Sequence, residues 1–323
     1  MKKSIIAIAV SSAALASVSV HAAEGSTVDV YGNIQYAYSD ADAGSDFEDN
    51  GSTIGLKGET KINDDLTAFF KYELEFKADQ KEDRLDTNGG DSSTGGYNQS
   101  HLDQAFVGLK GNFGKVQVGS FDTIYNNAIQ DSVDQFEYLG MTSASKTSEG
   151  DTIAYFSPSM NGFEVQVAAQ VKGDTTSEDN IDDEVDGTSV MGVVKYSTDL
   201  VSVALGYDSR ENTSTDPKAT TGLAVTVAPM ANLSITGKYE TTEDTQDILG
   251  LAARYGYGYG DLYGSFENID EDGAGKDKFN EYAAGVTYNL ASNVYVFGEV
   301  GKFENADDNK TDTKTSVGVY YGF

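Results

Sequence analysis

Apolar and polar residues alternate along most of the chain with a period of two. In the segment 66–78, Leu66, Phe70 and Tyr72 share one phase, while Lys71 and Glu73 occupy the other. Successive side chains of a β-strand point to opposite faces, so the pattern predicts strands with one apolar and one polar face. Sixteen segments have this pattern: 27–38, 52–62, 66–78, 101–111, 114–121, 151–157, 162–172, 188–197, 200–209, 220–228, 231–241, 246–257, 260–269, 278–289, 292–304 and 314–323.

The connections between these segments are of two kinds that alternate along the chain. Short turns, such as those at 63–65, 112–113 and 198–199, separate long polar loops. An even number of antiparallel strands, with short turns at one end and long loops at the other, is typical of an outer-membrane barrel. A soluble β-sandwich, the alternative, would not sort its loops in this way. The predicted long loops are at about 39–51, 79–100, 122–150, 173–187, 210–219, 242–245, 270–277 and 305–313.

The two faces of the predicted strands indicate what surrounds the barrel. Backbone groups in hydrocarbon must all be hydrogen-bonded, and a closed sheet achieves this without helices. Val165 and Leu205 have the phase that would meet lipid, whereas Glu73 and Gln166 would face water inside. We therefore predict an all-β fold, a 16-stranded antiparallel transmembrane β-barrel. Its lumen is a wet channel, because sixteen strands leave an open interior.

The N-terminus has the features of a secretory signal peptide. Lys2 and Lys3 precede an apolar run from Ile5 to about Val18, and the small Ala22 ends the segment. Residues 1–22 are therefore predicted to be removed on export, which leaves 23–323 as one barrel domain. The apolar run is shorter than the roughly 20 residues that a membrane-spanning helix needs.

Charge and composition exclude several other functions. The formal net charge of −30 would repel nucleic acid and makes cations the natural ionic partners. The absence of cysteine removes thiol catalysis and thiolate metal sites, and His101 is the only histidine after the signal peptide. We therefore predict that the protein is not an enzyme and has no cofactor or metal site.

Several stretches resemble the Gram-negative general porin family, whose members are non-specific outer-membrane channels. The likeness covers nearly all of 23–323, and it implies passive diffusion of small hydrophilic solutes and ions across the outer membrane of a Gram-negative bacterium. It also implies a homotrimer, contacts with outer-membrane lipid and lipopolysaccharide, and use of the terminal Phe323 as a signal to the barrel-assembly machinery. The matching stretches are Val28–Gly32, Ile54–Thr60, Ala105–Gly111, Ser157–Phe163 and Tyr320–Phe323.

The resemblance further implies that the third long loop, 122–150, folds inward and narrows the pore. In the family, acidic residues of this loop face a basic cluster on the opposite wall, and the field between them filters solutes by charge. The candidate constriction residues are Asp122, Asp131, Asp134, Phe136, Glu137 and Tyr138.

The wall opposite this loop has few cations in the sequence. Three positions where family members often carry Arg or Lys hold the neutral residues Asn33, Thr53 and Ser120. A thin positive wall opposite an acidic loop predicts a preference for cations. The inward-phased cations that remain as pore-wall candidates are Lys57, Lys71, Lys110, Lys238 and Arg254.

Two alternatives to a general porin stay open. A porin specific for a sugar or oligosaccharide would use aromatic residues along the lumen, and Tyr31, Phe69 and Tyr263 have the inward phase, although the chain has no Trp. The barrel could instead serve as a surface adhesin or phage receptor through its long loops.

Overall fold

The computed structural model describes residues 25–79, 100–144, 147, 149–171, 188–211, 217–272, 278–304 and 311–323. The predicted signal peptide, 1–22, lies outside these residues. So do most of the predicted loops at 79–100, 173–187 and 305–313, and parts of those at 210–219 and 270–277.

The described chain is almost entirely β-strand, in the positions that the alternation predicts. The strands are β1 (Ser26–Ala41), β2 (Gly44–Asp49), β3 (Ser52–Asn63), β4 (Leu66–Phe76), β5 (Ser100–Gly111), β6 (Gly114–Ser120), β7 (Thr152–Phe156), β8 (Phe163–Val171), β9 (Thr188–Ser197), β10 (Val201–Asp208), β11 (Thr220–Met230), β12 (Leu233–Thr242), β13 (Gln246–Gly256), β14 (Asp261–Glu271), β15 (Phe279–Ala291), β16 (Val294–Glu304) and β17 (Thr311–Gly322).

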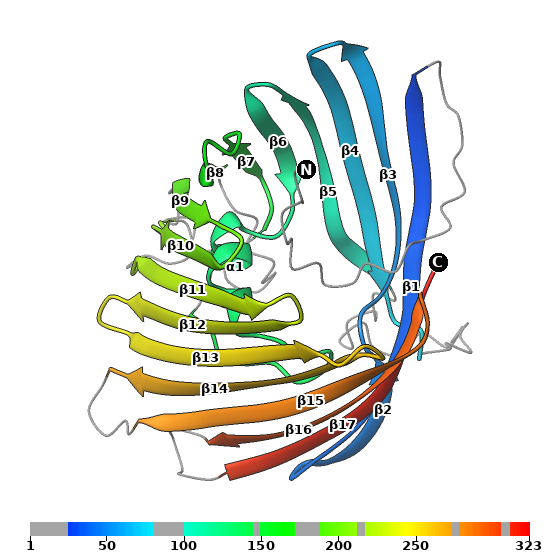
Figure 1. Ribbon diagram of the computed structural model, residues 1–323, viewed down its shortest axis with the longest axis vertical. Coiled ribbons are helices and arrows are strands. Elements are labelled where there is room, and N and C mark those ends of the chain that lie inside the picture. Colours follow the sequence, from blue (N-terminus) through cyan, green and yellow to red (C-terminus); the bar gives the residue numbers. More distant parts are fainter. Residues whose placement is uncertain are drawn as a thin grey trace, which may run out of the picture.

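These strands form one antiparallel sheet that closes on itself (Figure 1). β1 pairs with β17 on one side, where Asn33 lies opposite Gly322, and with β2 and β3 on the other. β2 and β3 pair with successive halves of β1, so together they occupy one strand position in the barrel wall. We call each such strand position a stave. The described sheet is therefore a closed barrel of sixteen staves, which confirms the predicted fold.

The first hairpin extends further than the sequence predicts. The polar residues of 39–51 predict a loop, but most of that segment is β2, in which Phe47 lies opposite Tyr38. The Phe47 ring also stacks on the ring of Tyr36, with their centroids 5.3 Å apart. Cross-strand aromatic contacts stabilise a hairpin, and they are not visible in the alternation of a single strand. The prediction of a loop over 39–51 is therefore wrong.

The two faces of the barrel wall differ as the alternation predicts. Outward side chains such as Val107 and Leu205 are apolar and exposed, by 62% and 53% respectively. Side chains of the opposite phase, such as Glu240 and Glu267, are fully buried inside the barrel. An apolar exterior and a polar interior are the arrangement that a barrel in a membrane requires.

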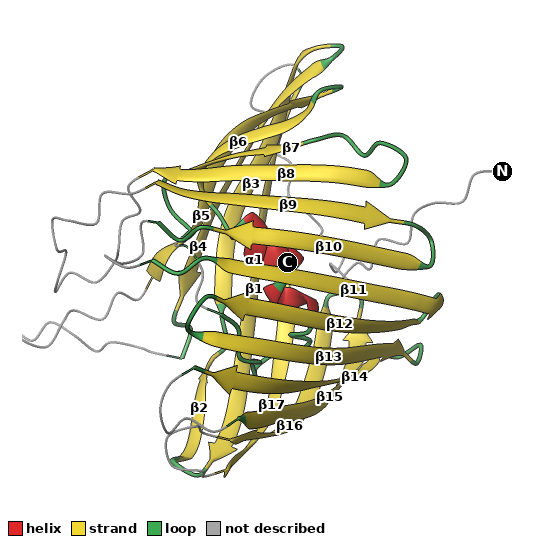
Figure 2. Ribbon diagram, turned by 90° about the vertical axis from the view of Figure 1, so that its left-hand side faces the viewer, coloured by secondary structure: helices red, strands yellow, loops and turns green. Residues whose placement is uncertain are grey.

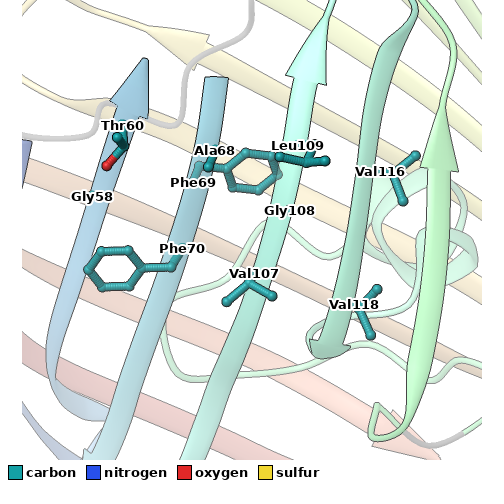
Figure 3. Close-up of a pocket in the computed structure, with 10 residues that line it drawn as sticks. All are labelled: Gly58, Thr60, Ala68, Phe69, Phe70, Val107, Gly108, Leu109, Val116 and Val118. Atoms are coloured by element: carbon teal, nitrogen blue, oxygen red, sulfur yellow. The ribbon is translucent and has the colours of Figure 1, made fainter. Parts of the chain in front are cut away.

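One part of the outer face, between β3 and β6, is hollowed into a groove of about 490 Å³ with an apolar lining (Figure 3). Phe70, Val107 and Val118 line it from β4, β5 and β6. Gly58 on β3 leaves room for the Phe70 ring, because a Cβ at Gly58 would lie 2.7 Å from Phe70 Cε1.

Short turns such as Asp64–Asp65 and Asn112–Phe113 join neighbouring strands, and Figure 2 shows several such turns at the same end of the barrel. The C-terminal residue, Phe323, closes the seam between the first and last strands. Its backbone exchanges two hydrogen bonds with Gly32 of β1, at 3.1 and 2.9 Å. Its ring lies so close to Gly32 that an added Cβ there would approach Phe323 Cζ to 2.7 Å.

Two short helical turns, α1 (Ile124–Ala128) and η1 (Gln130–Ser132), lie within the ring of strands (Figures 1 and 2). Both belong to the predicted third long loop. No helix in the described residues has the length and apolar character needed to cross a bilayer.

Candidate pore constriction

The chain between β6 and β7 runs through the inside of the barrel. We call residues 121–149 the inner segment; 145, 146 and 148 lie outside the described residues. A hydrogen bond of 3.0 Å from the Phe121 N–H to the Glu149 carbonyl joins its two ends. Between them, the segment bonds to inward side chains of β10, β12, β15 and β16. The inner segment therefore lies along one side of the lumen.

Helix α1 packs on a patch of the inner wall made mostly of small residues, among them Ala204, Gly222 and Ala224. Thr123 caps the helix, its Oγ1 accepting a hydrogen bond of 3.0 Å from the Asn126 N–H, which satisfies an otherwise unbonded donor of the first turn. Tyr125 and Ile129 are fully buried against the wall. A Cβ added at Gly222 of β11 would lie 2.3 Å from Ile129 Cγ2. The glycine thus provides the space in which the helix sits.

Four carboxylates of the wall hold the rest of the inner segment. Glu240 accepts a bond of 3.1 Å from the Ala144 N–H. Glu281 accepts bonds from the N–H and hydroxyl of Thr142, at 2.9 and 2.8 Å. Asp208 accepts hydrogen bonds from the N–H and hydroxyl of Thr147, at 3.0 and 2.7 Å. Glu299 is the fourth.

Glu299 binds the tip of the segment. Its two carboxylate oxygens accept hydrogen bonds from the backbone N–H groups of Glu137, Tyr138 and Leu139, at 2.6, 3.1 and 2.9 Å. The Tyr263 hydroxyl donates a further bond of 2.8 Å. A carboxylate that accepts several N–H groups makes strong, charge-assisted bonds, so this one side chain fixes the path of three consecutive residues.

Sequence reasoning missed these four anchors. Their signal is present but weak: each is a single acidic residue at an inward position of an otherwise unremarkable strand. An inward carboxylate is equally compatible with a residue that faces open water, and only the folded chain shows which of them meets backbone donors.

The predicted acidic residues of the constriction remain close to lumen water. Asp122 accepts a bond of 3.1 Å from Gln104, and Asp131 accepts one of 3.2 Å from Asn126. Asp134 is exposed, and its oxygens accept two long bonds from backbone N–H groups within the segment. Enclosure by the barrel removes part of the hydration of Asp134 and so raises the pKa of its carboxyl.

The other three predicted constriction residues hold the segment against the wall. Glu137 accepts a bond of 2.6 Å from the Tyr295 hydroxyl, and burial raises the pKa of its carboxyl. The Tyr138 hydroxyl bonds to Glu48 at 2.5 Å. Phe136 meets the ring of Tyr263 edge to face at 5.6 Å. The structure thus separates the group into water-facing acids and docking residues.

Two pairs of predicted wall residues lie together on β1, β3 and β4. The amide of Asn33 donates a bond of 2.8 Å to the Thr53 hydroxyl. Lys57 and Lys71 both lie over the ring of Tyr31, at 5.0 and 5.8 Å from its centroid.

The remaining residues of this wall are in different surroundings. Lys71 also pairs with Glu73 at 2.8 Å, and Lys110 pairs with Glu59. Ser120 is the last residue of β6, at the point where the chain leaves the wall for the inner segment. The structure therefore does not bring Ser120 together with Asn33 and Thr53.

Lys238 and Arg254 do not face the inner segment across the lumen, contrary to what the sequence suggests. Lys238 is buried in the wall, with its ammonium group 2.8 Å from Glu267. Arg254 lies under the segment, where it donates a bond of 3.1 Å to the Gln135 carbonyl and pairs with Asp261 at 3.1 Å. Closure of the barrel places both cations on the side where the segment docks.

Two inward lysines were not among the sequence candidates. Lys115 on β6 and Lys195 on β9 line a cavity beside the start of the inner segment. Their phase is opposite to that of the exposed Val118 and Val194 on the same strands, so alternation could have found them. They enlarge the positive part of the wall beyond what the sequence analysis predicts.

A closed barrel with an apolar exterior, a charged interior and a segment of chain inside it defines a membrane channel of the porin type. The family model described as Gram-negative porin matches residues 5–323, and the chain belongs to this family. Its members are channel proteins of the Gram-negative outer membrane, which is the location of this protein. The resemblance found in the sequence is thereby confirmed.

Relatives and solved structures agree with this family. The chain is 34% identical over 382 residues to a Halomonas protein named Monosaccharide porin, with 100% of both chains covered. It is 25% identical over 387 residues to Outer membrane porin F of Escherichia coli, again over 100% of both. The solved Salmonella typhi OmpF complex with daunomycin has a TM-score of 0.72 and 21% identity, covering 93% of this chain and 98% of that one, and this likeness shows the fold alone.

Proposed function

We propose that this porin is a water-filled channel for passive diffusion of small hydrophilic solutes and ions, and that it prefers cations. The observation that carries the proposal is the charge of the described lumen, where carboxylates outnumber cations. Fixed negative charge along a narrow pore raises the local concentration of cations. The carboxylates include Asp29, Glu48, Glu59, Glu73, Glu75, Asp103, Asp122, Asp131, Asp134, Glu137, Glu164, Asp208, Glu240, Asp261, Glu267, Glu281, Glu299 and Asp312; the cations include Lys57, Lys61, Lys71, Lys77, Lys110, Lys115, Lys195, Lys238, Arg254 and Lys314.

The distribution of the cations supports the same preference. Lys238 and Arg254 are already paired with carboxylates beneath the inner segment. The neutral pair of Asn33 and Thr53 occupies part of the remaining wall. Fewer positive charges therefore face the acidic Asp131 and Asp134 across the lumen than the total number of lysines and arginines suggests.

The test is the reversal potential of the refolded protein across a planar bilayer in a KCl gradient. We expect step openings and a potential of the sign for K⁺. Substituting both Asp131 and Asp134 with Asn should move the potential towards zero. The control is Asp247→Asn, which removes one carboxylate charge at an outward position of β13 beside the exposed Leu249, and it should leave the potential unchanged, whereas Asp131→Asn and Asp134→Asn should each shift it.

Each other outcome has a distinct meaning. A potential of the sign for chloride would keep the channel and overturn the cation preference. If fully folded protein gives no conductance, this would argue against the channel function and favour the surface adhesin or phage receptor.

A monosaccharide channel is the second candidate. It is favoured by the Halomonas relative, whose name is Monosaccharide porin, and by the ring of Tyr31, which lies in the lumen beside two lysines. Proteoliposome swelling distinguishes the two functions. A general porin admits sugars in order of their size, whereas a sugar-specific channel admits one sugar faster than a smaller one.

We also propose that the protein forms a homotrimer in outer-membrane lipid and lipopolysaccharide. The apolar groove between β3 and β6 supports this, because a second copy of the chain could fill it (Figure 3). Val107→Arg, in the groove, should abolish the trimer on cross-linking. Leu205→Arg, at an exposed outward position far along the barrel, should not. Equal loss of the trimer in both variants would place the interface elsewhere.

Two further proposals concern export and assembly. Cleavage after Ala22 should give a mature chain that starts at Ala23, which N-terminal sequencing checks. Gly32→Ala should slow insertion by the barrel-assembly machinery, because the added Cβ would lie 2.7 Å from Cζ of the terminal Phe323, as well as 2.5 Å from the Thr53 carbonyl oxygen. Gly298→Ala is the control, since a Cβ there meets no atom closer than 3.8 Å. Equal insertion of both variants would contradict a role for the seam at Phe323.

A further inference from the structure

A cavity of about 380 Å³ lies inside the barrel, between the wall strands β5 to β9 and the start of the inner segment. On the wall side it is lined by Lys115, Gln117, Phe156 and Lys195. Lys115 immediately follows the short turn between β5 and β6, so this part of the lining lies near the end of the barrel with short turns. In outer-membrane barrels that end faces the periplasm.

Two lysines border this cavity, and the carboxylates near them are Asp122 on the segment side and Glu164 on β8. The ammonium group of Lys115 lies 3.8 Å from the centroid of the Phe156 ring. Lys195 lies across from Glu164 of β8. Within the described part of the chain, neither ammonium group has a carboxylate oxygen within the 4.0 Å of an ion pair. Two cations therefore border the same cavity and are available to an anionic group.

The other lining groups are those that recognise hydroxyl groups and a ring. Gln117 and Gln166 are only 5% and 6% exposed, and an amide can both donate to and accept from a hydroxyl. Asp122, on the segment side, adds a carboxylate acceptor. Phe156 offers an apolar face to the C–H groups of a sugar ring. Small-molecule sites have volumes of about 300–1,000 Å³, so this cavity suits one sugar ring rather than a chain of them.

We propose that this cavity is a binding subsite for a monosaccharide that carries a carboxylate, such as a uronic acid. Lys115 and Lys195 bind the carboxylate, the two glutamines and Asp122 bind the hydroxyl groups, and Phe156 packs on the ring. The inference rests on the proposed channel function and adds a substrate class to it. A local basic subsite gives an anionic sugar a favourable position in a lumen that otherwise repels anions.

The test is the block of single-channel current by glucuronate added on the short-turn side, with glucose and acetate at equal concentration as comparisons. We expect glucuronate to interrupt the current at concentrations where glucose and acetate do not. Replacing Lys115 and Lys195 together with Gln should raise the half-blocking concentration about tenfold, the equivalent of about 1.4 kcal/mol. Replacing Lys302 and Lys314 together with Gln is the matched control, because it removes two positive charges outside the cavity, and it should leave the block unchanged.

The outcomes separate this inference from the proposed function. No conductance from folded wild-type protein would overturn the channel itself. Normal conductance with no block by glucuronate, or equal block by glucose or by acetate, would overturn only the subsite for a sugar acid. If the double variant does not fold, the wild type still decides: the block must weaken as KCl is raised from about 0.1 to about 1 M, because salt screens the lysine charges, and a block independent of salt would overturn the proposal.

Discussion

The contact between Glu299 and the tip of the inner segment can be tested with a single substitution. Glu299→Gln keeps the shape of the side chain but leaves one oxygen acceptor in place of two, and it adds an amide that itself donates. Three backbone N–H groups and the Tyr263 hydroxyl then compete for that oxygen. Bonds to a charged acceptor contribute about 1.5–3 kcal/mol each, so we expect the docked tip to lose about 3 kcal/mol, roughly a hundredfold in its equilibrium with a released tip.

Single-channel recording measures this change. A released tip should appear as added current fluctuation in the open state and as closure at lower voltage. The control is Glu75→Gln, because Glu75 also points into the lumen but pairs with Lys77 and His101 at 3.9 and 3.6 Å. Heat-modifiable electrophoretic mobility verifies that both barrels are folded. If folded Glu299→Gln protein shows no more current fluctuation than the control and closes at the same voltage, Glu299 does not hold the tip and the reasoning is refuted.

Two further predictions concern the same inner segment. Gly222→Ala should displace α1, because the new Cβ would lie 2.3 Å from Ile129; overpacking of this kind costs about 1–3 kcal/mol. Gly237→Ala, where nothing lies within 4 Å of the added Cβ, should change neither stability nor conductance. Equal melting temperatures and conductance for Gly222→Ala and Gly237→Ala would disprove that Gly222 provides the space for α1. The raised pKa values of Asp134 and Glu137 mean that, as the pH falls, each carboxyl is neutralised at a higher pH than an ordinary Asp or Glu side chain. Cation selectivity should therefore begin to fall at a higher pH than it would with ordinary carboxyls. Because the folded chain binds these protons more tightly, their contribution to stability is present at low pH and is lost as the pH rises through the folded pKa. Reversal potentials measured against pH should lose this early decline when both residues are made amides, and an unchanged curve would contradict the assignment.

The sequence by itself determined the barrel wall. The apolar and polar faces of each strand can be recognised from its own sequence, because successive side chains point to opposite faces whichever strand it pairs with. Alternation alone therefore places Val165 and Leu205 outward, and Glu73 and Gln166 inward, whichever strands they pair with. The number of staves and the order of turns and loops follow from the same local pattern.

Local pattern failed where a residue depends on a partner from another strand. The segment 39–51 has loop-like composition, yet Phe47 extends the hairpin by packing on Tyr36. Lys238 and Arg254 have the inward phase that the sequence predicts, but phase does not say on which side of the lumen a residue lies. Only closure of the sheet places both of them beneath the inner segment.

The tertiary structure alone decided how the inner segment is held. The hydrogen bond between Glu137 and Glu299 joins residues 162 positions apart, and that between Gln130 and Glu240 joins residues 110 apart. Such contacts exist only after the sheet has curved into a closed wall and brought distant strands around the same lumen. Alternation is a property of one strand and can be read from the chain, whereas the electrostatics of the pore come from the geometry of all sixteen staves together.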